Sequence, residues 1–188
     1  MSKIEAKARE LAGIVAELSQ HYALWWELGH PEIRSKWKRQ FNDHSDFFDS
    51  SARAHFQSVL IMAYQLLDSR SDVVSIRKLL QEIEVSHSAL VAASNAAISP
   101  HQEIFDRMNG IRSKVFAHRD SALGPDAIFE LASLSPEAIG ACVDTLCRVM
   151  NDLFFALVPD SEEFEFYEEI HHRTDCARDD LQRILAAL

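Results

Sequence analysis

The chain has 188 residues, 47% of them hydrophobic, which is enough for the core of one domain, with or without a helical arm. It has no run of about 18 apolar residues, which excludes a membrane-spanning helix, and its charged, amphipathic start is unlike a secretory signal. Three cysteines without metal-site spacing favour a reduced, cytoplasmic protein, and a net charge of −10 argues against general nucleic-acid binding, although a local basic patch could still bind RNA.

Apolar residues recur at steps of three and four through most of the sequence, which predicts amphipathic helices. Glycine and proline number only five each, so tight hairpins between strands are not expected. The predicted helices cover, in chain order, about 4–28, 32–41, 45–67, 73–98 (with a break near 86–88 as the alternative), 99–120, 136–157 and 167–188. The pattern predicts an all-α fold, an antiparallel helical bundle of about five to six helices.

Two serine–proline pairs predict where helices begin. Ser99 is expected to cap the helix that follows it, with Pro100 in the first turn and Gln102 completing a capping box. The pair Ser135-Pro136 predicts the start of the next helix in the same way.

Acidic residues are concentrated in the last third of the chain. Residues 1–120 contain 15 Lys+Arg and 15 Asp+Glu, whereas residues 121–188 contain 4 and 14, which leaves a net charge of −10 there. We expect a helical bundle over 1–158 and an acidic C-terminal helix over 159–188, packed on the bundle or at a dimer interface. That helix could also mask a basic groove or dock a partner protein.

The segment from Arg112 to Asp120 combines a phosphate-binding cation with an imidazole that exchanges protons near neutral pH. On a straight helix, Arg112 and His118 lie about 120° apart. They would converge if the helix frayed near Ala117, or if two chains paired about a two-fold axis. The simpler alternative is structural, with His118 at the edge of the core and Arg112 paired with an acidic neighbour.

The spacing of Arg112 and His118 resembles the Arg-x(4–6)-His signature of the HEPN superfamily (higher eukaryotes and prokaryotes nucleotide-binding domain). The ending Ala-His-Arg-Asp at 117–120, with Trp-Trp-Glu at 25–27 and Tyr-Gln-Leu-Leu-Asp at 64–68, resembles the branch linked to abortive infection of type U in bacteria. The resemblance covers roughly residues 20–158. It implies an α-helical bundle that often dimerises and, in catalytic members, a metal-independent endoribonuclease site that needs no cofactor.

Carried over to this chain, the resemblance implies that Arg112 and His118 are the catalytic residues. Ser113 stands where active members commonly have Asn, Asp or His; its hydroxyl can bind phosphate but cannot act as an acid or base near pH 7. Asp120 is expected to orient the imidazole. Further phosphate contacts are expected from two basic neighbours, Lys114 and Arg119. The expected partners are an RNA substrate, a second copy of the chain in a homodimer, and an antitoxin or other defence-system protein.

A second basic segment interleaves positive charge with the aromatic ring of Trp37. Its cations Lys36, Lys38 and Arg39 could bind the phosphates of single-stranded RNA while bases stack on the ring. The alternative is a solvated helix face with Trp37 packed inward.

Two other functions compete with that of a ribonuclease. The first is a di-iron enzyme. The pairs Glu84/His87 and Glu168/His171 repeat the Glu-x-x-His pattern of di-iron bundles, but the first helices offer no carboxylate clearly on an apolar stripe. The other is a catalytically inactive RNA- or protein-binding module controlled by a partner, such as half of a toxin–antitoxin or phage-defence pair.

Overall fold

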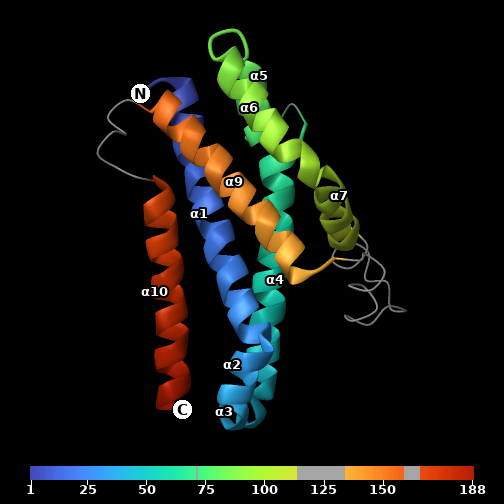
Figure 1. The fold of residues 1–188 in the computed structure, drawn as a ribbon, viewed down its shortest axis with the longest axis vertical. Helices are drawn as coiled ribbons and strands as arrows, with labels where there is room; N and C mark the ends of the chain where they lie inside the picture. The colour runs from blue at the N-terminus through green and yellow to red at the C-terminus, as the bar shows by residue number, and fades with distance from the viewer. Residues whose placement is uncertain (71, 114–133, 159–165) are drawn as a thin grey trace.

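The computed structural model describes residues 1–70, 72–113, 134–158 and 166–188. Within these ranges every regular element is a helix, so the predicted all-α class is confirmed. The helices, labelled as in Figure 1, are α1 (Lys3–Gly29), α2 (Pro31–Lys36), α3 (Lys38–Asp43), α4 (Ser45–Leu67), α5 (Ile76–Ile83), α6 (Ser88–Ile98), the 3-10 turn η1 (Ser99–His101), α7 (Gln102–Ile111), α9 (Pro136–Leu157) and α10 (Phe166–Ala187).

Helix α1 lies at the centre of the bundle and packs against α4, α9 and α10 (Figure 1). The short helices α2 and α3 reverse the chain, so α1 and α4 run in opposite directions. Helix α9 crosses α1 and α4 in this view, and α10 lies on the side of α1 away from α4. Helices α5, α6 and α7 complete the bundle beside α4 and α9, and α7 carries the candidate site.

Local capping explains where several helices begin. Ser2 caps α1: its hydroxyl accepts from the Glu5 N–H at 3.0 Å, and the Glu5 carboxylate accepts from the Ser2 N–H at 3.3 Å. Ser135 caps α9, as predicted, by accepting from the Ala138 N–H at 3.2 Å. Pro136 follows at the first helical position, where a missing N–H has no cost.

The predicted capping box at Ser99 is wrong. Helix α6 passes into η1 and then α7 without an extended residue, and Ser99 itself is helical, with φ −53° and ψ −42°. A residue in that conformation cannot turn its side chain onto the following N–H groups. The Gln102 side chain is therefore available for contacts with other helices.

Two further predictions concern helix continuity. The predicted helix over 32–41 is divided at Trp37 into α2 and α3. The predicted helix over 73–98 does break, between Ile83 and Ser88, as one of the two alternatives proposed. Among the described helices, none has a stretch that is both long and apolar enough to cross a membrane.

The main core joins α1, α4, α5, α6, α7, α9 and the first turns of α10. Helix α1 contributes fully buried Leu11, Val15 and Leu18, whose steps of four and three place them on one face. Helices α1 and α9 approach closely where the Tyr22 hydroxyl donates to the Pro136 carbonyl at 3.1 Å. A Cβ at Gly140 would overlap that hydroxyl, so the contact requires glycine at this position.

A second, smaller cluster lies where α1, α3, α4 and α10 meet. Its buried members are Leu28, Phe41, Phe48, Leu181 and Leu185. Polar contacts continue the junction along α1, where the Ser19 hydroxyl lies 3.2 Å from that of Thr174. The acidic C-terminal helix thus packs on α1 and α9 of the same chain.

The three cysteines have two different environments. Cys142 and Cys147 are buried in α9, whereas Cys176 is exposed on α10. Burial raises the pKa of each of the two α9 thiols to about 12, so both stay protonated at neutral pH.

Candidate active site

Arg112 follows α7 directly, where α7 packs against α4. Phe105, Met108 and Ile111 are buried along one face of α7 and fix the helix on the core. Arg112 itself is partly buried, so its long side chain reaches from this anchored helix toward α4.

The guanidinium of Arg112 lies over the ring of Tyr64, 3.8 Å from its centroid. Its Nε donates to Oδ1 of Asn109, one turn earlier, at 3.2 Å. A cation–π contact of this kind contributes about 0.5–2 kcal/mol. The hydrogen bond uses Nε and not the terminal Nη atoms, which are the donors for a bidentate grip on phosphate. The arginine is thus oriented by protein groups that do not compete with such a ligand.

Asp68 lies one turn after Tyr64 and carries a buried carboxylate. Burial, which leaves its side chain 4% exposed, tends to raise its pKa. Hydrogen bonds from the Arg70 N–H (2.9 Å), the Arg70 Nε (2.8 Å) and the Tyr64 hydroxyl outweigh burial, and the pKa of Asp68 lies below its usual value. Asp68 is therefore ionised at neutral pH, one turn after the tyrosine that lies under Arg112.

A cavity of about 290 Å³ lies between α4 and α7 beside this stack. Tyr64 and Asn109, the two residues that orient Arg112, both line it. Apolar side chains of both helices supply one part of its wall, and polar side chains supply the rest. The two side chains that orient the arginine thus also form part of the cavity wall.

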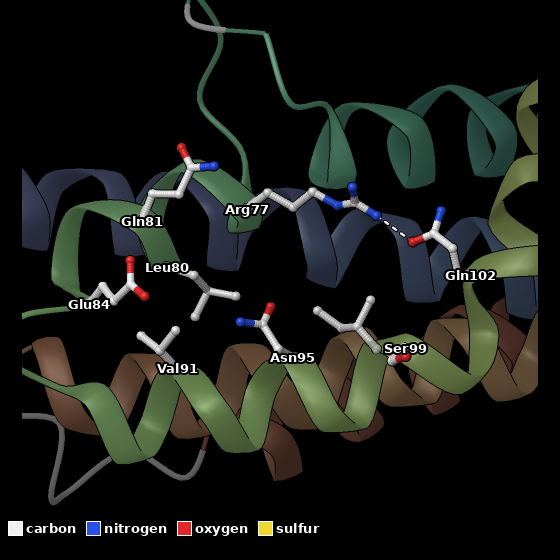
Figure 2. A pocket seen from close by; sticks show the side chains of 9 residues that line it. Arg77, Leu80, Gln81, Glu84, Val91, Asn95, Ser99 and Gln102 are labelled. Atoms are coloured by element: carbon white, nitrogen blue, oxygen red, sulfur yellow. Dashed lines mark hydrogen bonds between the residues drawn. The ribbon is translucent and has the colours of Figure 1, made fainter.

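A second cavity, of about 360 Å³, lies between α5, α6 and α7 (Figure 2). Arg77 and Gln102 line both cavities and hydrogen-bond to each other across the boundary. In Figure 2 the Arg77 side chain extends from α5 toward Gln102, while Leu80 and Val91 lie at the apolar base. The hydrogen-bonded Arg77–Gln102 pair is therefore a wall that the two cavities share.

The family-model comparison identifies the fold. A model of the HEPN group, described as AbiU2, matches residues 1–182. The chain belongs to the AbiU2 family of HEPN domains. Comparison with curated proteins and with solved structures gives no match. The resemblance to HEPN proteins of abortive infection is confirmed, over a longer stretch than the sequence motifs covered.

The structure describes only part of the motif that carried the AbiU2 resemblance. Arg112 and Ser113 lie in the described part, and Ser113, partly buried, follows the arginine directly. The other residues predicted for the site lie outside the described residues; they are Lys114, His118, Arg119 and Asp120. The predicted pairing of Arg112 with His118 therefore stays a prediction.

The second basic segment of this AbiU2 protein lies far along the bundle, against the end of α10 (Figure 1). The Trp37 Nε1 donates to Gln182 Oε1 at 3.0 Å, and its ring packs against the smaller core cluster. Lys36 lies over the Trp37 ring and 3.5 Å from Gln182, and Arg39 reaches the Leu188 carbonyl at 3.5 Å. Lys38 is exposed. RNA binding by these cations stays a prediction.

A histidine pair bridges α1 and α4 away from the arginine. The Nδ1 atoms of His21 and His55 lie 2.7 Å apart, so one ring donates and the other accepts. Burial lowers the pKa of both rings, with Glu17 opposing the shift at His21 and His21 adding to it at His55. No group of three or more metal-ligating side chains occurs among the described residues, which gives the di-iron alternative no support there.

Several site residues were missed by sequence reasoning. Tyr64 and Asp68 were noted only as part of the family resemblance, and Asn109 was not noted at all. The available signals were local: Tyr64 and Asp68 are four apart on one helix, and Asn109 and Arg112 are three apart. Only the packing of α4 against α7 brings the two pairs together.

Proposed function

We propose that this AbiU2-family protein is a metal-independent endoribonuclease of bacterial phage defence or of toxin–antitoxin type. Arg112 binds the phosphate and His118 transfers the proton. The observation that carries the proposal is the orientation of Arg112 by Tyr64 and Asn109, in which its terminal nitrogens donate no hydrogen bond to any described residue and can bind an anionic ligand. An arginine fixed before the substrate arrives stabilises charge without reorganising during the reaction.

RNA supplies its own nucleophile, the ribose 2′-hydroxyl. In the proposed reaction His118 accepts the 2′-hydroxyl proton, O2′ bonds to phosphorus, and the bond from phosphorus to O5′ breaks. The leaving O5′ takes a proton from a general acid, which is water or the His118 of a second chain. The products are a 2′,3′-cyclic phosphate and a 5′-hydroxyl end, and no metal or cofactor takes part.

Neighbouring groups have supporting roles in this proposal. Ser113 donates its hydroxyl to a phosphate oxygen, and Asp120 orients the imidazole of His118. Positive charge along the RNA comes from Lys114 and Arg119. Two chains form a homodimer that brings arginine and histidine from different copies into one groove, which removes the 120° mismatch on a straight helix.

The test is RNA cleavage in excess EDTA, followed by mass spectrometry of the new ends. We expect wild type to leave cyclic phosphates. His118→Ala should lower the rate about 10²–10⁴-fold, because a positioned acid or base contributes that much. Arg112→Ala should lower it about 10²–10³-fold, the usual effect of losing one oxyanion contact.

A matched control separates the site from general charge effects. Arg183→Ala removes the same charge from an exposed position on α10, where Arg183 pairs with Asp180 at 3.2 Å. Its rate should stay within a few-fold of wild type. Full cleavage by folded His118→Ala would reject the assignment. RNA binding by wild type with no cutting of any RNA would instead favour a partner-controlled binding module.

A further inference from the structure

The cavity between α4 and α7 has the size of a small-ligand site. Cavities that bind small molecules are typically about 300–1,000 Å³. At about 290 Å³ this one suits a single nucleoside better than a large cofactor. Tyr64, on whose ring the Arg112 guanidinium lies, is one of its lining residues. A phosphate on Arg112 would therefore have its own nucleoside beside this cavity.

The walls of the cavity match the two kinds of surface that a base presents. Ala63, Leu67, Phe105 and Met108 supply apolar area for the flat faces of a ring. Polar side chains of the wall can form hydrogen bonds with the edge of a base. Apart from residues near Asp68, they are Arg77, Gln102, Asp106 and Asn109. Few, placed polar groups on an apolar base are the usual composition of a specific site.

A chain of hydrogen bonds fixes the orientation of these polar groups. Arg77 donates to Gln102 Oε1, and Gln102 Nε2 donates to Asp106 Oδ1 at 2.8 Å (the first bond is drawn in Figure 2). That bond orients the carboxylate of Asp106, an exposed side chain that lines the cavity, and does not use its Oδ2. A carboxylate repels phosphate but accepts from the N–H groups on base edges. Within an RNA site, Asp106 therefore selects the base and not the backbone.

We infer that this cavity binds one RNA base, that of the nucleotide whose phosphate contacts Arg112, and that Asp106 accepts a hydrogen bond from that base. The inference rests on the proposed function for its ligand class. It makes cleavage dependent on the base at one position, since the four bases carry their N–H donors at different points of the edge that would meet Asp106.

Methionine methyl groups provide a direct test. The chain has four methionines, of which Met108 lines the cavity and Met150 is fully buried in α9. With ¹³C-methyl-methionine protein, each of the four nucleoside 3′-monophosphates is titrated to millimolar concentration. We expect at least one to shift Met108 saturably and to leave Met150 unchanged. Asp106→Ala should weaken that binding roughly tenfold, the usual effect of losing a hydrogen bond to a charged group.

Glu103→Ala is the matched control. Both acids are exposed on α7 three residues apart, but Glu103 pairs with Arg107 and does not line the cavity. Loss of a negative charge alone tightens binding of an anion, so Glu103→Ala should bind the nucleotide equally or slightly better. Equal responses of the two variants, or no shift of Met108 with any nucleotide, would overturn the inference.

The two proposals fail in different ways. If Met108 responds to nucleotide and Asp106→Ala weakens the response, but wild type cuts no RNA, the cavity assignment stands and the ribonuclease is rejected. If wild type cuts RNA in EDTA and Met108 does not respond, the ribonuclease stands and the base site is rejected. Melting temperatures of both variants establish that each is folded.

Discussion

At the scale of single residues, the central feature is an arginine held from two sides. The Tyr64 ring supports the face of the Arg112 guanidinium, and Asn109 accepts from its Nε. Asp68 follows Tyr64 by one turn, and hydrogen bonds from Arg70 keep it ionised. Each contact restricts a side chain that would otherwise lose much conformational entropy on binding a ligand.

Substitutions at Tyr64 separate the ring from its hydroxyl. Tyr64→Leu removes the cation–π contact, worth about 0.5–2 kcal/mol, and should weaken RNA binding roughly 2- to 30-fold. Tyr64→Phe keeps the aromatic ring, so its RNA affinity should fall much less than that of Tyr64→Leu. RNA affinity is measured by fluorescence anisotropy at one fixed salt concentration, since phosphate contacts depend on salt. Equal losses in both variants would show that the ring is not what positions Arg112.

Sequence patterns identified Arg112 as a site residue but did not identify the side chains that orient it. Arg112 stood out because an arginine and a histidine lie six residues apart, which is a local pattern. Tyr64 lies 48 positions away in another helix, and no periodicity relates the two. The contact depends on how α4 and α7 pack, which residue spacing within one helix does not determine.

At the scale of the elements, α1 and α4 form the most extensive contact of the bundle, and it includes a titratable pair. His21 and His55 share one hydrogen bond in a half-buried position. Protonating both rings would place two positive charges where a single proton now bridges two nitrogens. The contact is therefore compatible with neutral imidazole.

The pair should make folding stability depend on pH. Burial lowers the pKa of His21 and His55 below 6.5 in the folded protein. Above that value both rings are neutral in both states. As pH falls below it, the unfolded chain binds protons that the folded chain does not, so the free energy of unfolding decreases until the folded pKa values are reached. Melting temperatures between pH 8 and 5 measure this loss.

His55→Gln should make the melting temperature fall less steeply at acid pH, because it removes one of the two histidines whose pKa burial lowers. His44→Gln, at an exposed position, is the control and should leave the slope as in wild type. Parallel curves for wild type and His55→Gln would mean that other groups account for the acid sensitivity.

Helix positions followed from the sequence more fully than helix boundaries. The apolar stripes predicted the long helices because burial imposes a period near 3.6 residues. The boundary at Ser99 was predicted wrongly because a Ser-Pro pair fits a capped start and equally a 3-10 turn between two helices. Neighbouring helices decide between the two, and local sequence does not contain that information.

At the scale of the whole molecule, α10 packs along α1 and ends on a core cluster of its own. Leu181 and Leu185 join side chains from α1, α3 and α4 there. Aromatic Phe41 and Phe48 lie 4.7 Å apart between ring centroids at the same junction. The cluster ties the last helix to the turn between α1 and α4.

Neighbouring residues on α10 test how firmly that helix is held. Leu185 is 0% exposed and Ile184 is 53% exposed, yet both are branched aliphatic residues in the last turns of α10. Leu185→Ala should cost about 2–5 kcal/mol, as large-to-small substitutions in cores do. Ile184→Ala should change stability by less than about 0.5 kcal/mol. Urea unfolding measures both, and comparable effects would show that the small cluster does not stabilise the fold.

The placement of the cysteines gives the folded chain one nucleophilic thiol that solvent can reach, on α10. The two α9 thiols are protonated and covered, and a maleimide or disulfide reagent meets them only when the main core opens. Thiol modification of the native protein therefore measures core opening. Cys176 on α10 should react fast, and the slow reaction of Cys142 and Cys147 should report the transient exposure of α9.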